Sequence, residues 1–208
     1  MRILSKPVLL IVLGFAVATL TAEAGQEKLA ADLAKTSQEV GRTRDQLQST
    51  IDVLSRLVSQ KGGDLKPAFD AYRAEVVKTK KAAESTTATA AEMQKQSDAY
   101  FGEWQKEISS VSNAGLRKKG QKRMDAVKKN YTEAAKSLET AAGKFVPFLS
   151  DLGDIEKILT NDLTAGGIKS IKSTVSSAKF NMTNVRRSIQ TAMTSLNEMS
   201  AQLNRAAE

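Results

Sequence analysis

Residues 168–203 read IKSIKSTVSSAKFNMTNVRRSIQTAMTSLNEMSAQL. Apolar side chains recur along this stretch in alternating steps of three and four residues. This spacing places them on one side of an α-helix, where they would face partner helices along its whole length. The stretch therefore predicts a long amphipathic helix with one unbroken apolar seam. The series consists of Ile168, Ile171, Val175, Ala178, Met182, Val185, Ile189, Ala192, Leu196, Met199 and Leu203.

Strong turn signals divide the preceding chain at similar intervals. They are Gly62-Gly63, Asn113-Ala114-Gly115 and Gly166-Gly167. The same apolar periodicity continues between them, and short loops make neighbouring helices antiparallel. We therefore expect an all-α fold, an elongated up-down-up-down four-helix bundle of coiled-coil character, as a single domain over residues 25–208. The expected helices span about 26–60, 65–112, 115–163 and 167–206.

Local features of these helices are less regular. Thr36 and Thr43 of the first predicted helix occupy positions where the apolar periodicity predicts an apolar residue. Asp64 is the expected N-cap of the second helix, with Pro67 in its first turn. Pro147 lies within the third segment, but the apolar spacing continues across it. We expect a kink at Pro147; the alternative is a fifth, short helix that starts near it.

The first 24 residues have the features of a secretory signal peptide. Arg2 and Lys6 form a basic start, residues 7–20 form an apolar run, and Ala22-Glu23-Ala24 offers a cleavage site. The apolar run is shorter than the roughly 20 residues that a membrane-spanning helix needs. We therefore expect cleavage after Ala24 and an exported protein, periplasmic or secreted.

The composition excludes several classes of chemistry. The 208 residues contain no Cys and no His, which removes disulfides, thiolate nucleophiles, structural zinc sites and histidine bases. Carboxylates are scattered among basic and amide residues, so no acid/base pair stands out. The sequence thus predicts a protein that is not an enzyme, with no catalytic residues, no cofactor, no metal site and no implied small-molecule substrate.

A basic cluster at the start of the third predicted helix is the main candidate binding site. With a net charge of +8, the chain favours anionic partners. Asp125 is the sole acid from residue 117 to residue 129, although the positive end of a helix dipole favours acids. The candidate anion-binding residues are Arg117, Lys118, Lys119, Lys122, Arg123, Lys128 and Lys129.

Two interpretations of this cluster remain open. In one, folding of the hairpin pairs Lys122 with Glu107, and Arg123 or Lys119 with Glu103, across the turn. In the other, the excess cations contact anionic lipid or another polyanion. Specific nucleic-acid binding is not expected, because aromatic residues are not interleaved with the cations.

The aromatic group Tyr100-Phe101-Gly102-Glu103-Trp104 lies in the preceding helix. Helical spacing places Tyr100 or Phe101 on the same face as Trp104, opposite Met124 and Val127 of the next helix. We interpret this group as core packing at one end of the bundle, with a ligand pocket as the minor alternative.

Several motifs together resemble a bacterial family of signal-bearing, all-helical proteins classified as a domain of unknown function. They are Gly62-Gly63-Asp64-Leu65 before the helix with Tyr72, residues 100–104 with Ile108, Ser112-Asn113-Ala114-Gly115-Leu116-Arg117, and Phe148-Leu149-Ser150-Asp151-Leu152. The resemblance covers nearly the whole mature chain and implies an all-helical fold. Some members are labelled DNA repair ATPase, but the phosphate-loop lysine is replaced here by Gln121.

The sequence therefore favours a non-enzymatic structural, scaffolding or partner-binding role in the cell envelope. A protein partner or self-association is expected along the exposed helix faces. The alternatives are binding of a polyanion or an anionic membrane surface through the basic cluster, and a periplasmic holdase chaperone.

Overall fold

The computed structural model describes the backbone of residues 9–205 and the side chains of residues 24–205. Within this part of the chain it is all-α and contains no strand, as the sequence predicted. The helices are α1 (Leu9–Ser59), α2 (Lys66–Ser110), α3 (Ala114–Asn161), α4 (Ala165–Ser170) and α5 (Lys172–Arg205). Residues 1–8 of the expected signal segment lie outside the described residues, and residues 9–24 form the start of α1.

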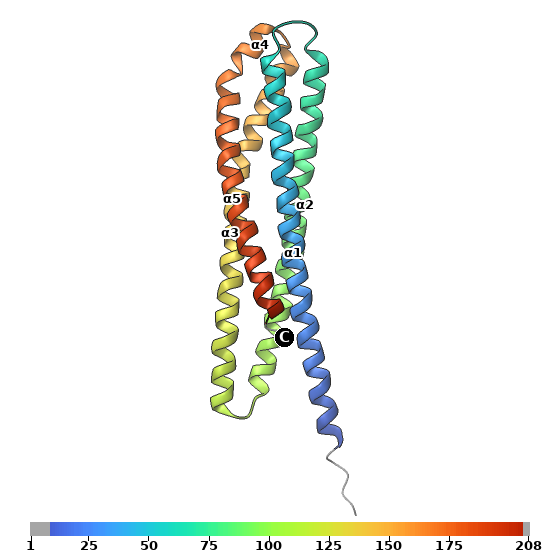
Figure 1. Ribbon diagram of the computed structural model, residues 1–208, viewed down its shortest axis with the longest axis vertical. Helices are drawn as coiled ribbons and strands as arrows, with labels where there is room; N and C mark the ends of the chain where they lie inside the picture. The colour runs from blue at the N-terminus through green and yellow to red at the C-terminus, as the bar shows by residue number, and fades with distance from the viewer. Residues whose placement is uncertain (1–8, 206–208) are drawn as a thin grey trace, which may run out of the picture.

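The four long helices lie side by side along the long axis of the molecule (Figure 1). α1 packs against α2 and α5, whereas α3 packs against α5 and, less extensively, α2. Each long helix therefore has two neighbours, which run in the opposite direction. Hydrogen bonds join all four of these pairs: Thr50 with Thr79, Ser200 with Ala30, Asn130 with Gln202 and Tyr72 with Leu152.

The predicted apolar seam of the last segment is confirmed in full. All eleven of its residues, from Ile168 to Leu203, are buried in the common core. The first segment contributes Leu29, Leu33 and Leu47 to the same core. Burial of such side chains provides about 1.5–3 kcal/mol each, which makes these seams the main source of stability in a chain without cysteine.

The polar interruptions in the first stripe form a seam of their own between α1 and α2. Thr36 and Thr43 are buried, as is Thr50 one heptad further on. The Thr43 hydroxyl lies 2.9 Å from that of Thr86, and the Thr50 hydroxyl lies 2.7 Å from that of Thr79. Thr36 Oγ1 donates instead to the Asp32 carbonyl oxygen of its own helix at 2.8 Å. All three hydroxyl groups therefore have hydrogen-bond partners, and the polar positions remain compatible with burial.

The start of α2 differs from the prediction by one residue. Leu65 occupies the N-cap position and provides no side-chain cap, whereas Asp64 Oδ1 accepts a hydrogen bond from the Lys66 N–H at 2.9 Å. Pro67 lies in the first turn, as expected. The preceding loop uses Gly63 at a φ of +80°, a conformation that suits glycine.

Pro147 lies inside α3, which continues through it, so no second helix begins there. The Pro147 ring cannot donate a backbone hydrogen bond to the Gly143 carbonyl four residues earlier. Both residues are exposed, and water can therefore replace the lost donor. Phe145 and Phe148, on either side of the proline, are buried in the core and hold the helix in place.

The fifth helix lies elsewhere, at the start of the last segment. The expected single helix from residue 167 is divided into α4 and α5, with a break at Ile171. Thr164 caps α4, because its Oγ1 accepts a hydrogen bond from the Gly167 N–H at 3.2 Å. A Cβ on Gly167 would lie 1.9 Å from the Asp162 carbonyl oxygen, so only glycine fits this turn.

The Gly167→Ala variant should therefore be strongly destabilised. The clash is with backbone, which has to shift, and we expect a loss of about 3 kcal/mol in the free energy of unfolding. Gly153→Ala is the matched control, since a Cβ there meets nothing within 4 Å. Alanine should stabilise that position in α3 by about 0.5–1 kcal/mol. Urea unfolding measures both, and equal effects of the two substitutions would contradict this account of the turn.

All three tyrosines are buried, and burial raises the pKa of each phenol. The pKa of Tyr100 rises to about 12, and that of Tyr131 is also raised. The pKa of Tyr72 is raised furthest, first by burial and then by the nearby Glu156 carboxylate. The Tyr72 hydroxyl donates to the Leu152 carbonyl oxygen at 2.7 Å and links α2 to α3.

Alkaline pH should therefore unfold the protein and ionise its tyrosines together. A phenol whose pKa is higher in the folded than in the unfolded chain stabilises the fold fully below the unfolded value of about 10. This contribution is lost as the pH rises toward the folded pKa. We expect tyrosinate absorbance and helical circular dichroism to change in one transition above about pH 10. Ionisation of the three phenols near pH 10 in a fully helical chain would disprove this link.

Candidate functional site

The hairpin between α2 and α3 forms one end of the molecule (Figure 1). The three residues Val111–Asn113 make the turn between the two helices. Asn113 caps α3, because its Oδ1 accepts a hydrogen bond from the Leu116 N–H at 3.0 Å. The Arg117 guanidinium donates to the Val111 carbonyl oxygen at 3.0 Å and closes the turn. We call residues 111–129 the basic tip.

All seven candidate cations of the basic tip are exposed. Among the described residues, Lys129 alone has an ion-pair partner, with its Nζ 3.9 Å from Glu133 Oε1. Lys128 Nζ lies 5.9 Å from the centre of the Phe101 ring, a cation–π contact. The remaining cations face solvent without a carboxylate within salt-bridge distance.

The expected ion pairs across the hairpin are absent from the described residues. Glu103 instead pairs with Lys106 of its own helix, at 2.6 Å. A reciprocal amide pair links the two helices, with the Gln105 and Gln121 side chains 3.1 and 3.2 Å apart. Because this pair is neutral, the positive charge of the tip remains uncompensated and can attract anions over about a Debye length.

The aromatic group packs into the core at the same end. Tyr100 and Phe101 are buried, as predicted, and their rings lie 5.1 Å apart in an edge-to-face arrangement. Trp104 is partly buried, with its ring 5.6 Å from that of Tyr100. Met124 of α3 is buried with them, which agrees with the expected packing across the hairpin.

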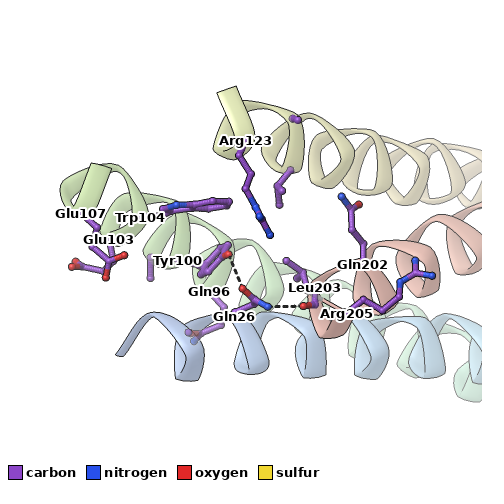
Figure 2. Close-up of a pocket in the computed structure, with 14 residues that line it drawn as sticks. Gln26, Gln96, Tyr100, Glu103, Trp104, Glu107, Arg123, Gln202, Leu203 and Arg205 are labelled. Carbon is purple, nitrogen blue, oxygen red and sulfur yellow. Dashed lines mark hydrogen bonds between the residues drawn. The ribbon is translucent and has the colours of Figure 1, made fainter. Parts of the chain in front are cut away.

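Trp104 and Tyr100 also line a cavity of about 900 Å³, at a group for which the sequence favoured core packing and left a ligand pocket as the minor alternative. The cavity lies where α5 ends at Arg205, while α2 and α3 continue to the tip (Figure 2). Its wall combines apolar groups with charged and amide groups from α1, α2, α3 and α5. The lining residues with polar or charged side chains are Gln26, Gln96, Tyr100, Glu103, Trp104, Glu107, Arg123, Gln202 and Arg205.

Hydrogen bonds of Gln26 fix one side of this cavity. Gln26 Nε2 donates to the Leu203 carbonyl oxygen at 2.5 Å, and the Tyr100 hydroxyl donates to Gln26 Oε1 at 3.5 Å (Figure 2). These contacts join α1 to α2 and to the last turn of α5. The sequence contained one signal for this cavity. The last predicted helix is shorter than the two before it, so those two helices extend beyond its end.

Electrostatics within the cavity are uneven. Burial raises the pKa of Glu107, and the neighbouring Glu103 carboxylate raises it further. Arg123 is the cation of the basic tip that also lines the cavity. The described residues contain no group of three metal-ligating side chains and no helix apolar enough to cross a membrane.

Comparison with known proteins places the chain in a family. No curated protein and no solved structure matches it. A family model matches residues 22–203 and so covers most of the chain, including every helix from α2 to α4. The chain therefore belongs to the family described as Protein of unknown function (DUF2959).

Proposed function

We propose that the protein is an exported, non-enzymatic helical-bundle protein of the cell envelope that attaches to an anionic membrane surface through its basic tip. In this proposal the signal peptide is removed after Ala24, and α1, α2, α3 and α5 act as an antiparallel four-helix bundle of coiled-coil character. The family match, which begins at residue 22, is consistent with a mature domain that starts close to this point.

The observation that carries the proposal is the uncompensated charge of the basic tip. Seven exposed cations have one ion-pair partner among the described residues. A cation near an anionic bilayer contributes about 1 kcal/mol to binding. Several such contacts provide substantial affinity without any shaped pocket, and an elongated bundle would then project away from the surface as a scaffold.

Leu116 favours a membrane over a soluble polyanion as the partner. Its side chain is 59% exposed at the first turn of α3, directly before Arg117 and Lys118. An exposed leucine among cations gains free energy when it enters the apolar boundary of a bilayer. A soluble polyanion offers the cations the same attraction but provides no apolar layer for Leu116.

The triple variant Lys118→Gln, Lys119→Gln, Lys122→Gln tests this proposal. Loss of three charges at about 1 kcal/mol each should lower binding to anionic phospholipid vesicles by about 100-fold at low salt. Wild-type binding should weaken steeply as salt is added, because the charges are exposed. Vesicle sedimentation of the purified mature protein measures both effects.

A second triple variant, Lys169→Gln, Lys172→Gln, Lys179→Gln, is the matched control. These residues are exposed, lack ion-pair partners among the described residues and lie away from the tip, so the change in net charge is the same. It should reduce vesicle binding only slightly. Equal losses in the two variants, or no loss in the first, would refute attachment through the tip. If the wild-type protein binds soluble polyphosphate but not vesicles, the partner of the tip is a soluble polyanion and not a membrane.

A further inference from the structure

The cavity at the end of α5 has walls of opposite charge that do not neutralise each other. Glu103 and Glu107 of α2 lie on one side of the Trp104 and Tyr100 rings, whereas Arg123 of α3 lies on the other (Figure 2). No salt bridge within 4 Å joins the two sides in the described part of the chain. The cavity therefore presents separate negative and positive regions to whatever enters it.

Glu107 has no ion-pair partner among the described residues, whereas Glu103 is paired with Lys106 of its own helix. Glu107 is partly buried next to Glu103, and neither carboxylate is paired with a group across the cavity. Burial raises the pKa of Glu107, and the Glu103 carboxylate raises it further. A cationic group placed beside Glu107 would relieve the repulsion, and the aromatic faces of Trp104 and Tyr100 nearby suit an alkylammonium in particular.

The positive region is formed by Arg123, with Arg205 further toward the end of α5 (Figure 2). A guanidinium presents a planar set of donors that matches a phosphate or carboxylate group. The Trp104 and Tyr100 rings lie between the two regions (Figure 2), and the apolar side chains of Val127 and Leu203 also line the cavity. Such a surface accommodates the methylene groups that separate the two charges of a small zwitterion.

The arrangement of charges decides between classes of ligand. A simple anion would gain from Arg123 but would be repelled by Glu103 and Glu107. A simple cation would be attracted by Glu103 and Glu107 but repelled by Arg123. We infer that the cavity binds a zwitterion that carries an alkylammonium and a phosphate, with the ammonium beside Glu107 and Trp104 and the phosphate beside Arg123. The choice of phosphate over carboxylate rests on the proposed attachment to phospholipid; the zwitterionic character does not.

Trp104 makes this inference directly measurable. It is the only tryptophan of the chain, so its fluorescence reports on the cavity alone. The purified mature protein is titrated with phosphoethanolamine, and separately with ethanolamine and with inorganic phosphate. We expect a saturable change in fluorescence with phosphoethanolamine, at least about tenfold tighter than with either half. No saturation by about 10 mM, or equal affinity for one half, would overturn the inference.

Single substitutions test the two regions. Arg123→Gln and Glu107→Gln each remove one charge and keep the approximate shape of the side chain, and each should weaken binding at least about tenfold. Lys119→Gln and Glu133→Gln are the matched controls, because both residues lie outside the cavity. They should leave the affinity unchanged. Unchanged affinity in both Arg123→Gln and Glu107→Gln, with circular dichroism showing folded chains, would also overturn the inference.

Additional arms separate the sources of the ligand and the two proposals. A Trp104 response to phosphatidylethanolamine vesicles as well as to soluble phosphoethanolamine supports a lipid headgroup, whereas a response to the soluble compound alone supports a free solute. The tip variant with Lys118, Lys119 and Lys122 replaced should keep its affinity for phosphoethanolamine while it loses its binding to anionic vesicles. If this variant keeps its affinity for phosphoethanolamine and loses its binding to anionic vesicles, the cavity and the tip act independently. Either of the two proposals can then be wrong while the other holds.

Discussion

Burial of one apolar seam on each long helix is the constraint on which the rest of the structure depends. The chain has no cysteine, and its described residues contain no metal-ligating group, so packing must hold the helices together. α1 and α5 are central to this packing, because each takes part in two of the three most extensive contacts between helices. The seam of α5 is aliphatic throughout, whereas α1 alternates leucines with threonines, of which Thr43 and Thr50 contact threonine hydroxyl groups of α2. The basic tip and the cavity depend on this frame, since both lie where the seams end.

The packing is uneven around the bundle, and this unevenness explains where binding features occur. α2 and α3 make the least extensive contact of the four neighbouring pairs. Between Thr79 and Met93, α2 contributes no buried residue, which agrees with the alanine- and threonine-rich composition of this stretch. The two helices are joined more firmly near their ends, by the Tyr72 hydroxyl at one end and by the aromatic cluster around Phe101 at the other. The tip is therefore anchored by aromatic packing although its outer surface is charged.

The sequence predicted the parts of the fold that follow from periodicity. The stripe from Ile168 to Leu203 repeats so regularly that its burial followed directly. The break at Ile171 could not be predicted, because that residue keeps the apolar spacing and is itself buried. The predicted ion pair between a tip cation and Glu103 was wrong for a local reason. Lys106, one turn away on the same helix, forms the ion pair with the Glu103 carboxylate. The cavity around Trp104 was expected only as the minor alternative for the aromatic group, because residues of four separate helices line it and no single stretch of sequence encodes that relation.

The contact between Gln26 and Leu203 has a topological consequence. It brings the part of α1 around Gln26 against the last described turn of α5, far along the long axis of the molecule from the Gly62-Gly63 loop (Figure 1). Chains whose ends lie close together tolerate circular permutation. A short linker between positions 26 and 203, with new termini opened within the glycine loop, would connect the helices in a new order with the helical core retained. The order of helices along the polypeptide is thus separable from their arrangement in space.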